Sequence, residues 1–190
     1  MSAQAIPFLT PEEYLAIERK AEIKSEYHRG TMYALPGNTI RHVKIVRNLT
    51  IDLGGRTRQT PCELFATDLK LWVEAEQLYA YPDLMIICGP PAIADNFRDT
   101  VTNPSIIIEV LSPSTEAYDR GKKFSYYQKV ASLKEYVLVS QDEARVERFT
   151  RQADGTWVLA NFVGLESSLT LAGIDCQVPL ATIYDRVDFS

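Results

Sequence analysis

The stretch that most constrains the fold is a nearly continuous apolar run, NPSIIIEVLSPST, at residues 103–115. Runs this apolar are typical of strands that are covered on both faces of a sheet, as in α/β proteins. One carboxylate, Glu109, interrupts the run before Val110 and Leu111. Because successive side chains of a strand point to opposite faces, Glu109 shares its face with Ile107 and Leu111. A buried strand therefore has to accommodate a carboxylate.

The other elements are predicted from periodicity and from turn residues. We expect helices over 9–20, 38–53 and 119–134, strands over 62–74, 79–89, 104–112 and 135–141, a short strand or hairpin over 24–37, a hairpin over 144–163, and a short strand with a closing helix over 169–187. The Gly54-Gly55 pair is expected to end the second helix, and Asp154-Gly155 to turn the C-terminal hairpin. This order predicts an α/β fold with a central mixed sheet flanked by helices.

The length and charge of the chain bound its organisation. A chain of 190 residues suggests one domain over 1–190. With 20 Lys and Arg against 25 Asp and Glu, the formal net charge is -5. A protein that coats nucleic acid would be basic, so this balance is mild evidence against a large nucleic-acid footprint. Carboxylates gathered around a metal would also make the chain acidic.

The cysteines and the N-terminus suggest a compartment. Cys62, Cys88 and Cys176 form no CxxC pair, which favours a reducing cytoplasm and disfavours disulfides or structural zinc. The first 20 residues lack a basic segment followed by an apolar one, so no signal peptide is expected. No apolar run approaches the roughly 18 residues of a membrane span. We therefore expect a cytoplasmic protein without membrane association.

Three carboxylates interrupt strand-like runs: Asp68, Asp83 and Glu109. Burying one ionised carboxylate costs several kcal/mol unless it is paired or bound to a cation. Two such acids on neighbouring strands repel each other, and a hard divalent cation such as Mg²⁺ relieves both problems. The alternative for each acid is a solvent-facing, edge or salt-bridged position. Asp83, which follows Pro82, would then only cap the start of its strand.

A positive charge follows in the segment DRGKKF, which contains Lys122 and Lys123. A lysine beside a metal-bound water can orient the nucleophile or stabilise charge on a phosphate. Lys123 is four residues after Asp119 and four before Tyr127, so these three side chains can line one helix face. At most one of the two lysines faces the site. The alternative is that both lie on a solvated surface.

These residues match a known family. The segments YPDLMII and IIIEVLSPSTEAYDRGKKFSYYQKVASLKEYVLV resemble the bacterial "putative restriction endonuclease" family of the PD-(D/E)XK nuclease superfamily. The segments SEYHRGTMYAL and HVKIVRNL match upstream in the same order, so the resemblance covers a core of about 8–142 and leaves a hairpin and closing segment at 143–190. It implies a restriction-endonuclease-like core and metal-dependent hydrolysis of DNA phosphodiesters.

The resemblance also assigns the site. Asp83 corresponds to the PD aspartate and Glu109 to the (D/E) position, and both would be ligands of Mg²⁺ or Mn²⁺, with the Val110 carbonyl as a third ligand. The lysine of the usual ExK motif would fall at position 111, where this chain has Leu111. In this family the lysine is expected on the following helix, at Lys123.

Other candidates have weaker support. Glu26 resembles an acid that precedes the first core strand and serves as an outer metal or water ligand, the alternative being an exposed residue beside Lys24 and Arg29. Accessory candidates are Asp68, His42, Asp119 and Tyr127. A basic stripe on the second helix, formed by Arg41, Lys44 and Arg47, would bind DNA phosphates or be a solvated face.

The function implied is that of a metal-dependent endonuclease acting on DNA, with a homodimer expected by analogy to nucleases that cut both strands. Two alternatives stay open. Leu111 and the acidic net charge favour a catalytically silent DNA- or protein-binding module that keeps the fold. The second is a metal-dependent hydrolase acting on RNA or another phosphodiester.

Overall fold

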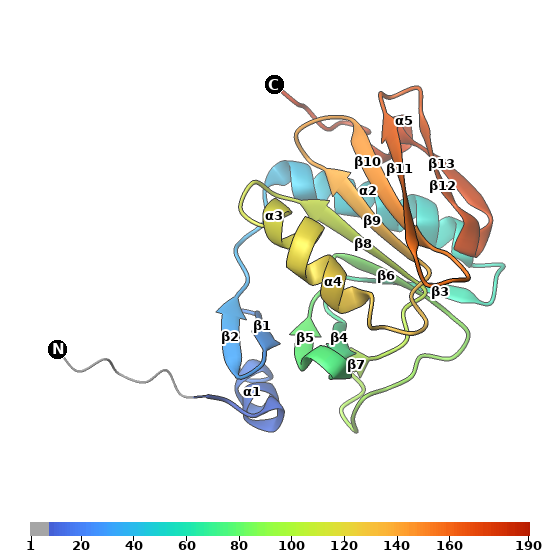
Figure 1. Ribbon diagram of the computed structural model, residues 1–190. Coiled ribbons are helices and arrows are strands. Elements are labelled where there is room, and N and C mark those ends of the chain that lie inside the picture. The colour runs from blue at the N-terminus through green and yellow to red at the C-terminus, as the bar shows by residue number, and fades with distance from the viewer. Residues whose placement is uncertain (1–7) are drawn as a thin grey trace.

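The computed structural model describes residues 8–190, and its main layer is a six-stranded mixed sheet (Figure 1). The strand order is β11-β10-β9-β8-β6-β3. These strands are β3 (Cys62–Ala66), β6 (Leu84–Cys88), β8 (Ile106–Leu111), β9 (Glu135–Ser140), β10 (Arg145–Arg151) and β11 (Trp157–Val163). Strands β8 and β9 are parallel, and the other neighbours are antiparallel. The predicted mixed sheet is confirmed.

A second sheet packs beside the first, in the order β2-β1-β5-β4-β7. It contains β1 (Ser25–His28), β2 (Thr31–Ala34), β4 (Lys70–Val73), β5 (Leu78–Ala80) and the short β7 (Thr100–Val101), with a 3₁₀ turn, η1 (Glu74–Glu76), between β4 and β5. The expectation of single strands over 62–74 and 79–89 is wrong, because each range divides between the two sheets. Thr67, with φ of 60°, breaks the first. Asp83 lies between β5 and β6, where the second of these ranges crosses from one sheet to the other.

Two helices begin with a threonine N-cap. Thr10 caps α1 (Pro11–Glu18) through a capping box, and Thr39 caps α2 (Ile40–Thr57). Helix α2 covers one face of the main sheet and runs past Gly54-Gly55, so the expected stop there is wrong. Glycine costs a helix roughly 1 kcal/mol, and burial of Leu53 and Thr57 at the far end of α2 offsets that cost.

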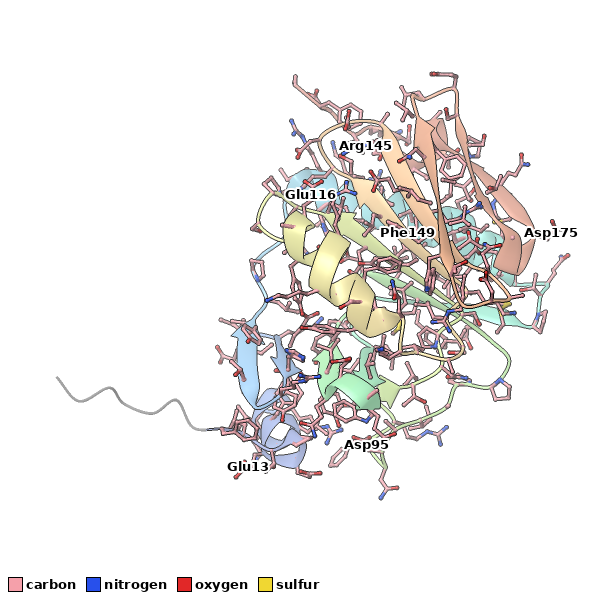
Figure 2. The ribbon with its side chains drawn as sticks, viewed as in Figure 1. Glu13, Asp95, Glu116, Arg145, Phe149 and Asp175 are labelled. Carbon is pink, nitrogen blue, oxygen red and sulfur yellow. A yellow bond between two sulfur atoms is a disulfide. The ribbon has the colours of Figure 1, made fainter. Side chains whose placement is uncertain are left out.

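The opposite face is covered by α3 (Glu116–Tyr118), a π-helical turn (Asp119–Lys123) and α4 (Phe124–Tyr127). The predicted helix over 119–134 thus begins earlier and ends earlier. Phe124 of α4 packs against Phe149 of β10, labelled in Figure 2, with ring centroids 4.4 Å apart.

The alternation predicted for β8 is confirmed. Ile106, Ile108 and Val110 belong to the core under α2, whereas Ile107 and Leu111 belong to the core under α4. Glu109, which is also buried, lies between Ile107 and Leu111 on the α4 face. The carboxylate of Glu109 therefore lies on the face of the sheet that the short helices cover.

The C-terminal segment extends the main sheet and closes the α2 side. Strands β10 and β11 form the predicted hairpin around Asp154-Gly155, with Gly155 at φ of 85°. Two further strands, β12 (Ser168–Leu171) and β13 (Cys176–Pro179), flank a 3₁₀ turn, η3 (Ala172–Ile174), and lead into α5 (Leu180–Ile183). Leu169, Val178 and Ile183 of this segment join the core under α2.

The structure bears on the expectations about disulfides and about a membrane span. The expectation of no disulfide is wrong: Cys62 and Cys88 face each other on antiparallel β3 and β6 and are bonded. The two cysteines are 26 residues apart in the sequence, so no spacing motif indicated this pairing. Within residues 8–190, no helix is long and apolar enough to cross a bilayer. The expectation about a signal peptide concerns a segment that includes residues 1–7, which lie outside the described residues.

Candidate active site

A cleft of about 670 Å³ lies between the two sheets, where β8 ends and the chain crosses from β5 to β6. Its lining includes residues of the connection from β2 into α2 and of the connection from β8 into α3; both connections can be followed in Figure 1. Seven of the candidate residues line it: Glu26, His42, Asp83, Glu109, Val110, Asp119 and Lys123. They come from five different segments of the chain, so the fold assembles a cluster that is dispersed in the sequence.

Asp83 is held at both carboxylate oxygens. The Val110 N–H donates to Oδ2 at 2.7 Å, and His42 Nε2 lies 3.0 Å from Oδ1. His42 is buried on α2 and reaches Asp83 from the opposite side of the sheet to Lys123. Both contacts orient Asp83 toward the end of β8. Asp83 therefore does more than cap the start of its strand.

Glu109 is buried and contacts three groups. Tyr127 Oη donates to Oε1 at 3.0 Å, and Lys123 Nζ lies 3.0 Å from the same oxygen. The Asp83 N–H points to Oε2 at 3.3 Å. Burial raises the pKa of the Tyr127 hydroxyl well above its usual value, so this hydroxyl remains a donor. Glu109 and Asp83 thus lie side by side at the crossing between the sheets.

Lys123 is the cation of the cluster. Its Nζ lies 3.0 Å from Glu109, 3.2 Å from Glu26 and 3.6 Å from Asp119, and the side chain is buried. Its neighbour Lys122 is exposed, as expected if only one of the two faces the site. Leu111, at the position of the usual motif lysine, belongs to the apolar core. The structure therefore places an ammonium group beside Glu109 from a helix.

Glu26 joins this cluster, so the alternative of an exposed residue is wrong. Its side chain is buried, and its Oε1 accepts a hydrogen bond from the Tyr81 N–H at 3.1 Å. Sequence reasoning missed Tyr81 and its partner Glu18, which accepts from Tyr81 Oη at 2.8 Å. The position of Tyr81, two residues before Asp83, was the available signal. Glu18 belongs to no motif, so its contact with Tyr81 could be found only from the tertiary structure.

The cluster has more carboxylates than ammonium groups: Glu26, Glu109 and Asp119 contact Lys123, and Asp83 lies beside Glu109. The pKa of Glu109 is raised to about 8, mainly by burial, with Asp83, Asp119 and Glu26 adding to the rise and Lys123 opposing it. Burial likewise raises the pKa of Asp119. Burial by itself would lower the pKa of Lys123, but Glu109 and Glu26 outweigh it and hold that pKa well above its usual value. Lys123 therefore stays charged, and additional positive charge would stabilise the site.

The donor set suits a cation that keeps part of its water shell. Within residues 8–190, no three His, Cys, Asp or Glu side chains converge to hold a metal by themselves. Mg²⁺ is usually bound through one or two carboxylates and retains several waters. The adjacent carboxylates of Asp83 and Glu109 fit that requirement, whereas they do not fit an ion that needs an all-protein shell.

The remaining candidates lie elsewhere. Asp68 occupies the turn between β3 and β4, is exposed and pairs with Lys24, so the expectation that it reaches the cluster is wrong. The basic stripe on α2 lies away from the cleft. Lys44 donates to the Arg186 carbonyl, Arg41 pairs with Asp142, and Arg47 donates to Asn48. Helix α2 turns His42 toward Asp83, and this rotation directs the basic stripe toward the C-terminal tail.

Comparison with solved structures identifies the class of fold. A crystal structure from Anabaena variabilis, described as a "putative nuclease belonging to DUF820", matches 93% of this chain and 97% of that chain with a TM-score of 0.74. The two sequences are 17% identical, so the likeness concerns the fold alone. With its mixed sheet and flanking helices, the molecule is a restriction-endonuclease-like α/β protein.

Sequence comparison identifies the family. The Uma2 family, described as "Putative restriction endonuclease", matches residues 11–181. Two proteins of Synechocystis, both described as uncharacterized, are also similar: sll1609 is 36% identical over 82% of this chain and 88% of its own length, and slr1290 is 34% identical over 96% and 95%. The chain belongs to the Uma2 family, which confirms the resemblance inferred from its motifs.

Proposed function

We propose that this protein is an endonuclease that hydrolyses DNA phosphodiester bonds with Mg²⁺ or Mn²⁺. One observation carries the proposal: Asp83 and Glu109 meet at the crossing between the two sheets, with Lys123 Nζ 3.0 Å from Glu109. Membership of a family described as restriction endonucleases supports it. The cleft is open to a substrate and is lined by these same residues.

Asp83 and Glu109 would hold the metal. The Val110 carbonyl is a candidate third ligand, because the N–H and C=O of a strand residue point to the same edge and the Val110 N–H points to Asp83. A bound divalent ion lowers the pKa of a water and offsets charge on the phosphate. His42 keeps Asp83 oriented, and Tyr127 does the same for Glu109.

Lys123 has a separate task. It remains protonated beside three carboxylates, so it can donate hydrogen bonds to a phosphate oxygen or steady an attacking water in the transition state. Glu26 and Asp119 hold the ammonium in place. This arrangement supports an active enzyme over a silent binding module, for which Leu111 was the main argument.

Nicking of supercoiled plasmid in Mg²⁺ or Mn²⁺ tests the proposal. We expect the wild type to convert plasmid to the open-circular form, and the isosteric Asp83→Asn variant to be at least about a hundredfold slower. Asp68→Asn is the matched control, since it removes an equivalent charge outside the cleft. Equal nicking by wild type and Asp83→Asn, or no nicking by the wild type, would overturn the proposal.

Two finer points belong to the same proposal. A single-stranded RNA substrate, assayed in parallel, distinguishes a deoxyribonuclease from a hydrolase acting on RNA. Cleavage of both DNA strands would need two copies of this site, so we propose a homodimer. Sedimentation analysis with and without duplex DNA tests that assembly, and a monomer under both conditions contradicts it.

A further inference from the structure

The start of helix α2 forms one lip of the cleft. Its N-cap residue, Thr39, and the third helical residue, His42, both line the cleft. Thr39 Oγ1 accepts a hydrogen bond from the His42 N–H at 3.1 Å. The N–H groups of Ile40 and Arg41, in the same first turn, have no hydrogen-bond partner within residues 8–190. Free N–H groups and the helix dipole make such a terminus favourable for an anion.

A second, independent donor lies beside this terminus. Gln141 follows β9, lines the cleft and is 2% exposed. Its Oε1 accepts a hydrogen bond from Thr39 Oγ1. Thr39 Oγ1 thus accepts from the His42 N–H and gives its own proton to Gln141. Gln141 Nε2 is then a buried donor, without a partner in the part of the chain that the structure describes.

Buried amide donors nearly always have an acceptor. Within the described residues no acceptor lies within hydrogen-bond distance of Gln141 Nε2, and the α2 terminus beside it presents further donors. The facing turn of the cleft contributes hydroxyl groups from Ser112, Ser114 and Thr115. The residue after Gln141, Asp142, is largely exposed and pairs with Arg41. This lip therefore presents main-chain and amide donors, and hydroxyl groups that can donate or accept, in contrast to the carboxylates elsewhere in the cleft.

We propose that the first turn of α2 and Gln141 Nε2 bind a non-scissile backbone phosphate of the nucleic acid. The inference rests on the proposed nuclease function, because His42 joins the two places: its N–H belongs to the α2 terminus and its Nε2 contacts Asp83. Helix N-termini are common phosphate sites. A phosphate held here positions the strand so that a neighbouring phosphodiester lies near Asp83 and Glu109. The site uses main-chain N–H groups, and so differs from the basic stripe on the outer face of α2.

Two substitutions of Gln141 test this site. Gln141→Glu replaces the donor by a carboxylate, and Gln141→Met removes the amide at similar length. Gln152→Glu is the matched control, because Gln152 is exposed near the turn of the β10–β11 hairpin and the substitution makes the same change of net charge. Binding of a short fluorescent duplex is measured by anisotropy in Ca²⁺, and KM and kcat for plasmid nicking in Mg²⁺.

We expect Gln141→Glu to weaken duplex binding about tenfold or more, and Gln141→Met about threefold to tenfold, as for loss of a hydrogen bond to a charged group. KM should rise more than kcat falls, and inorganic phosphate should compete more weakly with the duplex in both variants. A residue with a purely structural role would lower the melting temperature without this split. If Gln141→Glu does not fold, Gln141→Met decides the question.

Duplex binding by both Gln141 variants that equals the wild type overturns the proposal. Equal weakening by Gln141→Glu and Gln152→Glu does so too, since the effect would then come from net charge. If the wild type nicks plasmid and the Gln141 variants bind normally, only the phosphate site fails. If the wild type does not nick but Gln141→Glu still loses duplex binding, the nuclease proposal fails and the phosphate site stands.

Discussion

Two clusters of charged side chains in this protein have opposite electrostatic character. In the first, Arg19 and Lys70 face Asp95 and Asp99, with Arg19 Nη2 2.9 Å and Lys70 Nζ 2.8 Å from Asp99. Asp95, labelled in Figure 2, lies in the loop before β7 and also pairs with Arg19. The hydrogen bond from Arg19, together with Lys70, holds the pKa of Asp99 well below its usual range. Two cations balance two carboxylates.

The cleft cluster is unbalanced, since Glu26, Glu109 and Asp119 contact the single ammonium of Lys123 and Asp83 adds a fourth carboxylate beside Glu109. Burial and the neighbouring carboxylates raise the pKa of Glu109 to about 8, the opposite direction to Asp99. A cluster that only joins segments of the chain can have equal numbers of cations and carboxylates, as the cluster of Arg19, Lys70, Asp95 and Asp99 does. Residual negative charge in a cleft is characteristic of a site that receives a cation or a proton.

The largest effect is expected from removing the cation of the unbalanced cluster. Lys123→Met should slow plasmid nicking by about a hundredfold to a thousandfold, because it removes a fixed positive charge from the reacting centre. Gel assays of the nicking rate in Mg²⁺ provide the measurement. Lys122→Met is the matched control, since Lys122 is adjacent but exposed. Equal rates for the two variants would show that Lys123 has no role in the reaction.

The pH dependence of stability should differ between the clusters. The pKa of Glu109 is raised on folding, so its proton stabilises the folded state, and this contribution is lost as the pH rises through about 8. Without metal, the free energy of unfolding should fall by about 1–3 kcal/mol between pH 6 and pH 8. Asp99 adds no pH dependence in this window. The stabilisation that comes from its lowered pKa is fully present near neutral pH and is lost only in acid. Urea titrations at several pH values provide the measurement.

Glu109→Gln is the control for this pH effect, and its stability should be nearly independent of pH over the same range. Added Mg²⁺ should also flatten the dependence, because an ion bound to Glu109 replaces the proton. A wild-type stability that rises between pH 6 and pH 8 would contradict the charge assignment of the cleft.

Single substitutions should shift stability in opposite directions in the two clusters. Arg19→Leu leaves Asp95 and Asp99 without their main partner, so we expect a loss of about 1–3 kcal/mol, moderated by their partial exposure. Asp119→Asn removes one carboxylate from the unbalanced cluster and should leave stability unchanged or raise it by up to about 1 kcal/mol. Chemical denaturation of both variants checks the signs. A clear destabilisation by Asp119→Asn would mean that the cleft cluster is balanced after all.

The smallest effect is expected at the exposed pair of Lys24 and Asp68. Exposed ion pairs contribute about 0–1 kcal/mol, so Asp68→Ala should change the free energy of unfolding by less than about 0.5 kcal/mol. Plasmid nicking should be unaffected. A large loss of activity would return Asp68 to the site, against its position in the turn between β3 and β4.

Much of the fold and part of the site could be predicted from local patterns. The alternation along β8 predicted which side chains share a face with Glu109, and periodicity with turn residues predicted helices close to the observed α1 and α2. The helical spacing of Asp119, Lys123 and Tyr127 brought these three side chains to one face, as predicted. These properties depend on residues a few positions apart, and backbone geometry alone relates them.

Contacts between distant segments could not be predicted in the same way. Asp68 and Asp83 both interrupt strand-like runs, yet Asp68 lies in an exposed turn while Asp83 lies at the crossing between sheets. Glu26 has a charged and polar sequence context but is buried against Lys123. The bond between Cys62 and Cys88 depends on strand register, which compositional arguments do not contain.

Local sequence patterns were enough to predict that β6 and β8 are buried, that a carboxylate interrupts a buried run, and that a lysine follows on a helix, because burial and periodicity are properties of short segments. It took the folded molecule to show that three carboxylates contact the ammonium of Lys123, and that Gln141 lies beside the start of α2. The physical reason is that charge balance and hydrogen-bond satisfaction depend on packing. They emerge only when segments up to about a hundred residues apart come within a few ångströms, as Thr39 and Gln141 do across 102 positions.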